Sequence, residues 1–351
     1  TYDVGDFDKV LRRAELEADL AGFDTRKDKD ASRGLLRGLG LCYYIESILG
    51  DPSESAKVEF NEDGTVNIYV GTQSTGQGHE TVYRQFLSDQ TGIPAEQIFV
   101  IQGDSDRIKQ GGGTGGSRSV TVQNNATLAT VSAMKEAFTA FLSDEMGVPA
   151  SEITFDDERF RAEGSNLTPT MLEVAEMARE KGREDLLAHE ERKTLDARSF
   201  PNGCHVSEVV IDPDTGVVTV DRYTVVDDFG NLINPILAEG QVHGGVAQGI
   251  GQAITEHVVY NSEGQLLTAT FMDYALPRAD IVPNISFTSE PVPSTANTWV
   301  ESARPLAAVK RVDGAPAEGE RNEIIDDWTG IEYFQTGLSG AERSQISITS
   351  P

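Results

Sequence analysis

The sequence predicts an α+β fold: two similar lobes, each an antiparallel sheet with helices packed on one side, with glycine-rich loops between the lobes. Two observations lead to this fold class. A chain of 351 residues exceeds the length at which a single hydrophobic core usually stops growing, which favours two lobes. Each half of the chain also shows the same order of patterns, a β-hairpin at 57–70 or 206–226 followed by a loop and a helix.

The first half of the chain alternates between helical and strand patterns. Apolar residues recur at helical spacing over residues 6–21, whereas residues 24–32 are polar and predict a linker. Residues 34–48 are apolar and rich in β-formers, which predicts a buried strand. The hairpin at 57–70 turns at 61–64. Further patterns predict a helix at 79–90, a strand at 98–102, a long helix at 120–146 and a strand at 153–161.

The second half begins with a capped helix. Thr168 is the predicted N-cap, and Gly182 is the residue expected to end the helix. A charged, exposed connection is expected at 183–198, before the hairpin at 206–226. The acidic turn of that hairpin, at 212–216, offers too few oxygen ligands for calcium. The remaining patterns predict a helix at 236–255, a hairpin around 261–264 and a final strand at 284–290.

These patterns divide the chain into three parts. Residues 1–32 are predicted to form an N-terminal helix and linker. Residues 33–298 form the main domain, with one lobe at 33–182 and the other at 199–298. Residues 299–351 show little apolar periodicity and predict a divergent tail.

The predicted helix at 236–255 contains an unusual number of glycines. A glycine inside a helix costs roughly 1 kcal/mol relative to alanine. So many glycines need a reason, and we expect the backbone there to approach another element or a ligand closely. The glycines are Gly240, Gly244, Gly245, Gly249 and Gly251.

Composition excludes several classes of protein. A formal net charge of −28 opposes binding to nucleic acid or to an anionic membrane, and there is no apolar run of about 18 residues that would span a bilayer. The two cysteines, Cys42 and Cys204, form no CxxC pair, so neither a zinc site nor an iron–sulfur cluster is supported. A reduced, cytoplasmic chain is the expectation. No GxSxG motif supports hydrolase chemistry.

Two glycine-rich loops, at 71–81 and 111–119, carry the strongest functional signal. Each leads from a strand pattern into a helix pattern, where exposed backbone N–H groups bind anions. If the loops are neighbours, these groups point into the same region. Together with the Gln77 amide and the hydroxyls of Ser117 and Ser119, they would suit a large phosphate-bearing cofactor. Either loop by itself could instead be a tight turn.

These segments resemble the second molybdopterin-binding region of the xanthine dehydrogenase and aldehyde oxidase family. The sequence of these motifs is most similar to that of the bacterial branch, which includes carbon monoxide dehydrogenase large subunits. The resemblance covers most of residues 1–300 and only the C-terminal, molybdopterin-binding half of the family's subunit. It rests on Gly76–Thr81, Gly103–Asp106 and Gly113–Ser119, and it continues through Asp227–Gly230, Asn234–Pro235 and Gly240–Gly244.

The resemblance implies a molybdenum–molybdopterin cofactor, expected in its cytosine dinucleotide form and bound without metal ligands from the chain. Gln77 and the backbone of Gly76 and Gly78 would lie against the pterin or the oxygen ligands of the metal. Gln241 would be a second amide close to the metal centre. The pterin and its phosphates would be held by Gly115, Gly116, Ser117, Arg118 and Ser119.

The resemblance also implies a reaction and partners. Such enzymes hydroxylate or oxidise a small molecule, for example an aldehyde, a purine or carbon monoxide, and pass the electrons to iron–sulfur and FAD subunits. The N-terminal half of the large subunit would supply the rest of the cofactor pocket. A dimer of the complex is expected in the cytoplasm, with no nucleic-acid or membrane partner.

The family's catalytic motif does not occur in this chain. The resemblance predicts Val-Lys-Gly-x-Gly-Glu, whose glutamate is the catalytic base, but here Val309-Lys310 is not followed by Gly-x-Gly-Glu. Glu301, Glu318 and Glu320 are possible substitutes that spacing does not separate, so no catalytic residue is assigned. Two interpretations stay open: a molybdenum-dependent oxidoreductase, or a non-catalytic cofactor-binding fragment or inactive homologue. A tail translated in an altered reading frame would also explain the loss.

Two histidines and two carboxylate pairs lie beside these motifs. A histidine near a loop is more often a structural hydrogen-bonding group than a catalyst. We therefore expect structural roles for His79 and His243. The Asp104–Asp106 and Asp227–Asp228 pairs are expected to organise turns.

Overall fold

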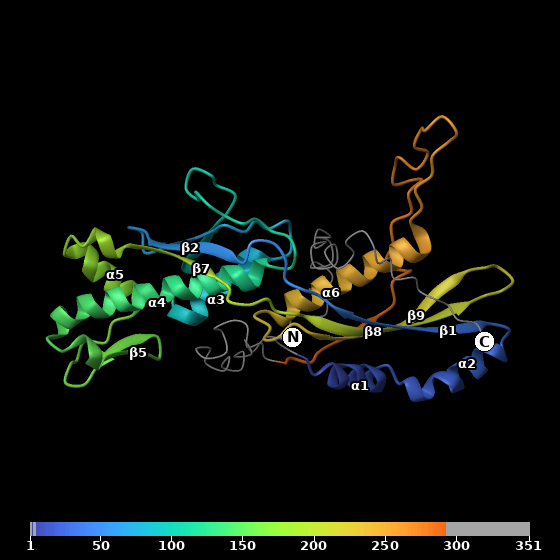
Figure 1. The fold of residues 1–351 in the computed structure, drawn as a ribbon, viewed down its shortest axis with the longest axis horizontal. Coiled ribbons are helices and arrows are strands. Elements are labelled where there is room, and N and C mark those ends of the chain that lie inside the picture. The colour runs from blue at the N-terminus through green and yellow to red at the C-terminus, as the bar shows by residue number, and fades with distance from the viewer. Residues whose placement is uncertain (1, 3–4, 293–351) are drawn as a thin grey trace. The chain divides into compact units, whose positions relative to one another are not determined.

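The computed structural model describes residue 2 and residues 5–292. By their contacts with one another these residues form two units: unit 1 contains the residues up to Ser47 and those from Ser199 onward, and unit 2 contains Ile48–Arg198. Both units combine helices with mostly antiparallel sheets, which confirms the predicted α+β fold class (Figure 1). The predicted tail at 299–351 lies outside the described residues.

Unit 2 is built on a four-stranded sheet with the order β4-β3-β2-β7. The predicted hairpin is present, formed by β2 (Ser53–Phe60) and β3 (Val66–Val70). β7 (Ala188–Thr194) pairs antiparallel with β2, and β4 (Ile98–Ile101) pairs parallel with β3. The charged segment 183–198 is therefore not merely a connection. It contains an edge strand, where charged side chains are tolerated because they remain in water.

Helices cover the unit 2 sheet and close its core. α4 (Ser119–Met146) contacts β2, β7 and α3 (His79–Thr91). Phe138 of α4 is fully buried, and its ring lies 5.6 Å from that of Phe60 and 6.2 Å from that of Phe160. The long helix predicted at 120–146 is thus confirmed as the main cover of the sheet.

The segment after α4 forms a small hairpin and a capped helix. β5 (Ile153–Asp156) pairs with β6 (Arg159–Ala162), and α5 (Met171–Glu180) follows. The N-cap is Thr170 rather than the predicted Thr168. Thr170 accepts the backbone N–H of Glu173, whose carboxylate accepts the backbone N–H of Thr170 in return, and this reciprocal pair fixes the start of the helix.

Unit 1 contains a second four-stranded sheet, with the order β1-β8-β9-β10. The predicted hairpin is confirmed as β8 (Asn202–Ile211) and β9 (Val218–Asp228). β1 (Leu36–Ile45) pairs antiparallel with β8, and β10 (Ile285–Ser289) pairs parallel with β9. This pairing places β1 in unit 1, whereas the expected lobe boundary at residue 33 grouped it with the first hairpin.

β1 is an edge strand, and the expectation of a buried strand at 34–48 is wrong. Leu36 and Leu41 are 57% and 48% exposed. An edge strand has one free side and is covered less completely than a central strand, so an apolar composition does not by itself imply burial.

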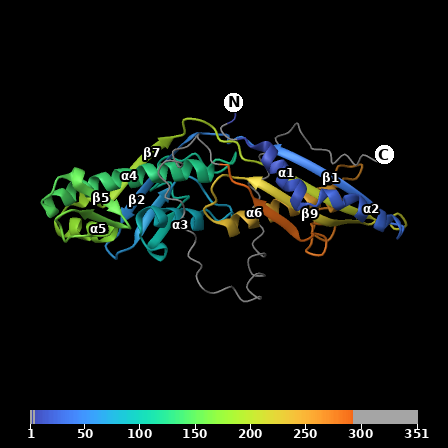
Figure 2. The same cartoon turned by 90° about the horizontal axis from the view of Figure 1, so that it is seen from below.

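Helices lie on both faces of the unit 1 sheet, and the expectation of one covered face is wrong here. α1 (Phe7–Glu17) and α2 (Phe23–Ala31) lie on one side and α6 (Pro235–Ile250) on the other (Figures 1 and 2). Val226 packs in the α1 core, whereas its neighbour Val225 packs in the α6 core. Successive side chains of a strand point to opposite faces, so β9 carries apolar residues toward both layers.

α2 replaces the linker predicted at 24–32. The helix lacks an apolar stripe and is held by ion pairs instead. Arg26 donates to Glu208 at 2.6 Å, and Asp30 accepts from Arg37 at 2.7 Å. A polar helix of this kind escapes an apolar-periodicity search, because its stabilising partners lie far away in the sequence.

The two sheets have the same topology. Each contains a hairpin, then a helix, then a parallel strand beside the second hairpin strand, and an antiparallel strand on the other side. The prediction of two similar lobes is confirmed. The chain reaches this arrangement by exchange: β1 precedes the unit 2 hairpin and β7 precedes the unit 1 hairpin, yet each strand joins the other sheet.

The helix predicted at 236–255 is confirmed as α6 followed by a π-helical turn, Gly251–Thr255. A projecting segment, orange in Figure 1, links it to β10. The hairpin expected around 261–264 is reduced to an isolated bridge between Tyr260 and Leu266.

Replacing Glu208 by glutamine should lower the free energy of unfolding by about 2 kcal/mol, because Arg26 and Arg37 lose the buried carboxylate that they share. Arg37 keeps its pairs with Asp30 and Asp221, and Arg26 keeps its pair with Asp19. The Glu208 and Arg37 side chains are only 2% and 7% exposed, with their charged atoms 2.6 Å apart. Denaturant titration followed by circular dichroism measures the change. Asp185→Asn, which removes the exposed Arg183–Asp185 pair, is the control and should leave the midpoint unchanged. A Glu208→Gln midpoint equal to wild type would contradict the expected role of the network.

Candidate functional site

The first glycine-rich loop joins β3 to α3 and is shaped around the Gln77 side chain. Gln77 is 5% exposed. Its carbonyl oxygen accepts the backbone N–H of Thr75 at 2.5 Å and the Ser74 hydroxyl at 3.2 Å. Gly76 and Gly78 flank it with φ of 112° and 82°, values that L-residues rarely adopt. The carbonyl end of the Gln77 amide therefore serves the loop.

The second loop runs into α4 through three consecutive residues with positive φ. Gly115, Gly116 and Ser117 have φ of 157°, 66° and 57°. Ser117 holds a left-handed conformation that costs a non-glycine residue roughly 1–2 kcal/mol. Arg118, the N-cap of α4, makes no side-chain capping bond. The first turn of this helix therefore presents backbone N–H groups together with the positive end of the helix dipole.

The two loops are neighbours, as their proposed use of a common region requires. The Gly113 N–H donates to the carbonyl of Gly71 at 3.2 Å, and the Gln73 N–H donates to the Thr114 hydroxyl at 3.0 Å. A Cβ on Gly71 would lie 2.6 Å from the Cα of Gly111. Glycine is required at this crossing because the two backbones touch directly.

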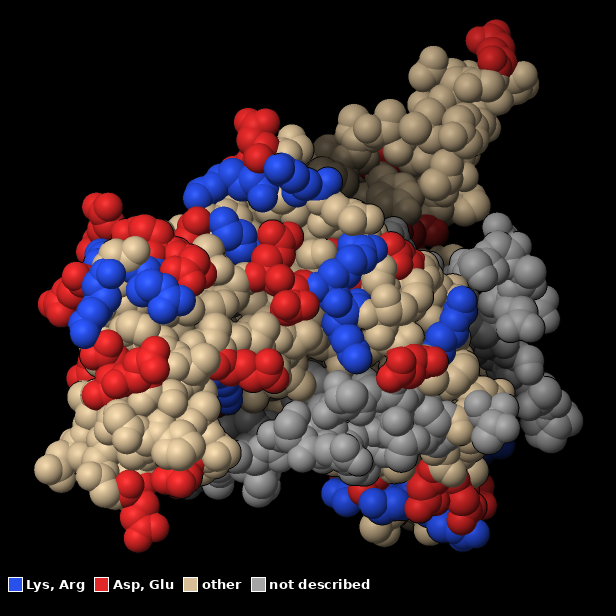
Figure 3. All heavy atoms as spheres, turned by 60° about the vertical axis from the view of Figure 1, so that its left-hand side comes forward, with Lys and Arg blue, Asp and Glu red and all other residues tan. Residues whose placement is uncertain are grey.

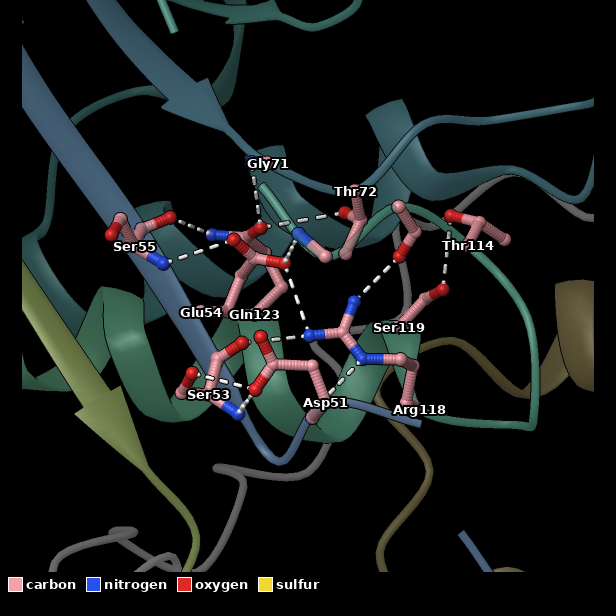
Figure 4. Close-up of polar contacts among 12 residues, drawn as sticks. Asp51, Ser53, Glu54, Ser55, Gly71, Thr72, Thr114, Arg118, Ser119 and Gln123 are labelled. Carbon is pink, nitrogen blue, oxygen red and sulfur yellow. Dashed lines mark hydrogen bonds and ion pairs between the residues drawn. The ribbon is translucent and has the colours of Figure 1, made fainter. Parts of the chain in front are cut away.

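A buried polar cluster holds the crossing in place (Figure 4). Gln123 of α4 is fully buried; its carbonyl accepts the Gly71 N–H at 3.1 Å, and its NH₂ donates to the carbonyl of Ser55 at 3.0 Å. Beside it, the guanidinium of Arg118 lies 3.1 Å from the carboxylate of Glu54. The cluster thus joins α4, β2 and both loops.

Arg118, expected to hold the pterin or its phosphates, is committed to protein groups. Its three guanidinium nitrogens donate to the backbone carbonyls of Asp51, Ser53 and Gly113 at 2.6–2.8 Å, in addition to the carboxylate of Glu54. The Arg118 side chain is 2% exposed. In the part of the chain that the structure describes, the Arg118 side chain therefore binds the loop backbone and has a structural role.

Glu54 and Gln123 contribute to the site but lie outside the sequence motifs, and Thr114 lies inside a motif but was given no role. The sequence did contain a signal for Glu54, because it lies on the same buried face of β2 as Ala56 and Val58. A carboxylate on a buried apolar face needs a partner of opposite charge. Nothing in the local pattern of α4 distinguishes Gln123 from other polar residues.

Gln241 lies in unit 1, on α6, whereas both loops belong to unit 2. Its carbonyl oxygen is buried and has no hydrogen-bond partner among the described residues. A buried amide oxygen of this kind is costly unless water, an ion or a ligand group satisfies it. The observation agrees with a ligand-binding role for Gln241.

Close backbone approach explains the glycine that begins the π-helical turn after α6, but not three of the glycines inside α6. A Cβ on Gly251 would lie 2.8 Å from the ring of Pro277, so close backbone approach is confirmed there. At Gly240, Gly244 and Gly249, a Cβ would meet no atom of the described residues within 4 Å. Packing inside unit 1 therefore does not account for these three glycines.

Of the neighbouring titratable groups, Asp104 and Asp228 organise turns, whereas His79 is buried and its Nδ1 has no hydrogen-bond partner among the described residues. His79 is 3% exposed, and its ring lies 5.2 Å from that of Tyr83. The Asp104 carboxylate accepts the backbone N–H of Asp106 at 3.0 Å and so organises its turn. Asp228 accepts the N–H of Gly230 at 2.9 Å. Glu301, Glu318 and Glu320 lie outside the described residues.

Among residues 5–292, no group of three His, Cys, Asp or Glu side chains is placed to hold a metal ion. The described part of the chain also contains no helix with both the length and the apolar character needed to cross a membrane.

The sequence of residues 14–283 matches the molybdopterin cofactor-binding domain family. The chain belongs to this family. It is 30% identical to the carbon monoxide dehydrogenase large chain of Afipia carboxidovorans over 80% of its own length and 38% of that protein. It is also 30% identical to the nicotine 6-hydroxylase large subunit of Paenarthrobacter nicotinovorans, over 80% of its own length and 37% of that subunit. The resemblance found in the motifs is confirmed.

Solved structures agree with these relatives. A Cu,Mo-CO dehydrogenase in the carbon monoxide reduced state superposes with a TM-score of 0.75 at 28% identity, over 84% of this chain and 40% of that one. Quinoline 2-oxidoreductase from Pseudomonas putida 86 also gives 0.75, at 27% identity over the same shares. This chain spans about two fifths of the length of these relatives.

The residues present fit the cofactor that the family name implies. Such a group needs amide donors, backbone that a ligand can approach closely, and local positive potential for phosphate. Gln77, the turn Gly115–Ser117 and the uncapped start of α4 supply these in unit 2.

Burial of His79 predicts acid sensitivity. Desolvation lowers the pKa of His79 to about 4, below the value of about 6.5 in an unfolded chain. Between these values the unfolded state binds the proton and the folded state does not, so stability falls as pH falls from 6.5 toward 4, by up to about 1.4 kcal/mol per pH unit. Denaturant titrations between pH 7.5 and 4 should therefore show a shallower decline for His79→Gln than for wild type. Parallel profiles would refute this role of His79.

Proposed function

We propose that this chain is the part of a molybdenum hydroxylase large subunit that binds the molybdenum–molybdopterin cofactor through the loops of unit 2. The observation that carries the proposal is the crossing of the loops at Gly71 and Gly111. There two glycine-rich segments, each leading into a helix, are fixed against each other by buried polar groups. A single turn would not need this arrangement. A ligand held by both loops at once does.

The loop residues divide the binding between them. The Gln77 NH₂ donates to the pterin or to an oxygen beside it, and Gly76 and Gly78 allow the backbone to approach. The amides of Gly115, Gly116 and Ser117, together with Ser119 at the start of α4, hold the phosphates. Arg118 supports their loop from within the protein. When bound, the molybdenum centre supplies the two-electron oxidation chemistry.

The cofactor form and the contribution of unit 1 are part of the proposal. Similarity to bacterial carbon monoxide dehydrogenase and nicotine 6-hydroxylase subunits favours the cytosine dinucleotide form. Gln241 of α6 is the proposed unit 1 contact, supported by its unpartnered oxygen. Mass spectrometry of the released nucleotide distinguishes cytosine from other bases.

The acidity of the chain does not prevent anion binding. The formal net charge is −28, but acidic and basic side chains are interspersed on the face shown in Figure 3. The Debye length is about 8 Å at physiological ionic strength, so distant carboxylates are screened. Local N–H groups at the start of α4 dominate the potential that a bound phosphate experiences.

The relatives support a proposal for the substrate and the partners. We propose a small molecule such as an aldehyde, a purine or carbon monoxide as substrate. Relatives are named as a large chain and as subunit gamma of a dehydrogenase complex, which supports assembly with iron–sulfur and FAD subunits and with an N-terminal half of the large subunit. A dimeric, cytoplasmic complex is the proposed setting.

A second candidate function is cofactor binding without turnover. The absence of Gly-x-Gly-Glu after Val309-Lys310 favours it. The assembled complex with full cofactor content would then fail to reduce an electron-accepting dye with any aldehyde, purine or carbon monoxide. Dye reduction with any of these substrates would exclude this candidate.

The full-length subunit in its complex should contain molybdenum and a pterin nucleotide, measured by elemental analysis and by fluorescence of the oxidised pterin.

Gln77→Ala should weaken cofactor binding about ten- to a hundredfold, because hydrogen bonds to charged groups contribute roughly 1.5–3 kcal/mol. Gln77→Glu should be worse. Its carboxylate can still accept the Thr75 N–H, but it cannot donate and adds negative charge beside an anion.

Gln77→Glu is the decisive variant, because it preserves the contact that shapes the loop while removing the donor. Thermal unfolding measured on the same samples separates lost binding from lost stability. Full cofactor occupancy in Gln77→Glu would refute the assignment of Gln77. A folded wild-type complex without molybdenum and pterin would refute the function.

A further inference from the structure

We propose that the buried Glu54–Arg118 ion pair is a positioning unit that sets the spacing of the two cofactor loops. This inference rests on the proposed function for its consequence, but not for its geometry. Glu54 is not among the residues expected to hold the cofactor, and the Arg118 guanidinium, which was expected to hold it, donates to protein groups instead. Their effect on binding acts through the backbone of the loops that they hold.

Glu54 is the acceptor at the centre of the unit. Its side chain is fully buried. One carboxylate oxygen accepts the Ser55 N–H at 3.0 Å, and the other accepts the Gly112 N–H at 2.9 Å and the Arg118 guanidinium at 3.1 Å. A strand of the sheet is thereby bonded directly to the second loop.

Arg118 ties the second loop to the first residue of β2 and to the segment before it. It donates to the carbonyls of Asp51 and Ser53, each at 2.8 Å, and to the carbonyl of Gly113 at 2.6 Å. Only a guanidinium, with five donors in a rigid plane, can serve these acceptors and Glu54 together. Because Arg118 is also the N-cap of α4, the pair fixes the loop and the helix start as one body.

The pair lies in direct contact with the backbone of both loops. A Cβ on Gly112 would lie 2.5 Å from the Arg118 guanidinium, and a Cβ on Gly71 would overlap the Glu54 carboxylate. Displacing either charged group therefore moves the Gly71–Gly111 crossing. The two charges also cancel, so the unit fixes geometry without placing a net negative charge beside an anion site.

The test compares two buried Arg–Glu pairs in the full-length subunit within its complex. Glu54→Gln removes the charge that holds the loops. Glu208→Gln removes an equally buried charge in unit 1, paired with Arg37. Both should lower the unfolding temperature. Molybdenum and pterin per folded chain should fall at least tenfold in Glu54→Gln and stay at the wild-type level in Glu208→Gln.

Amide hydrogen exchange gives a readout that does not depend on the cofactor. In Glu54→Gln, exchange should accelerate in peptides covering 71–78 and 111–117, while β3 stays protected. Unchanged exchange in these loops, or full cofactor content in Glu54→Gln, would overturn the positioning role. Equal cofactor loss in Glu208→Gln would also overturn it, since the loss would then follow stability alone.

Gly112→Ala keeps both charges and decides the matter if Glu54→Gln does not fold. The added methyl displaces the guanidinium, so loop exchange should accelerate and cofactor content should fall. Wild-type values for both in a folded Gly112→Ala protein would overturn the inference. If the wild-type complex contains no cofactor, the proposed function is refuted. If the variants still show faster exchange in the loops than that wild-type complex, the positioning role stands.

Discussion

The backbone contact between Gly71 and Gly111 is the constraint on which the candidate site depends. Two backbone segments can touch this closely only if every backbone hydrogen bond to water that is lost is replaced by one within the protein. Gln123 accepts the Gly71 N–H, Glu54 accepts the Gly112 N–H, and the carbonyl of Gly71 accepts the Gly113 N–H. The result is a rigid base for the loop of Gln77 and for the Gly115–Ser117 turn, the two segments that we propose hold the cofactor.

The repeated topology explains how the chain reaches this arrangement. In both units a hairpin leads through a loop into a helix, which returns to a parallel strand beside the hairpin. Such a crossover places the loop and the helix start at the end of the second hairpin strand. In unit 2 this is the loop of Gln77, and in unit 1 it is the approach to α6, which carries Gln241. Exchange of β1 and β7 makes each sheet depend on residues distant in the sequence.

Much of this was predictable from the sequence, and the failures have physical causes. The alternating apolar residues of β2 and β3 and the glycines at 76, 78, 115 and 116 revealed the hairpin, the loops and the family. The pairing of β1 with β8 was not predictable, because strand partners are set by tertiary contacts. α2 was missed because ion pairs rather than an apolar stripe hold it. The role of Arg118 was predicted as ligand contact, whereas its hydrogen bonds go to Glu54 and to backbone carbonyls that motif spacing does not reveal.

The most direct measurement is a crystal structure of the molybdenum-loaded full-length protein, with the metal located by its anomalous scattering. Cofactor density should contact Gly76–Gly78, Gly115–Ser117 and Ser119, with the side chains of Glu54 and Arg118 paired with each other and without contact to the cofactor. Density bound by other residues, with both loops free of it, would contradict the assignment of the loops. Density against the Arg118 guanidinium itself would show that this residue binds the cofactor instead of positioning the loop.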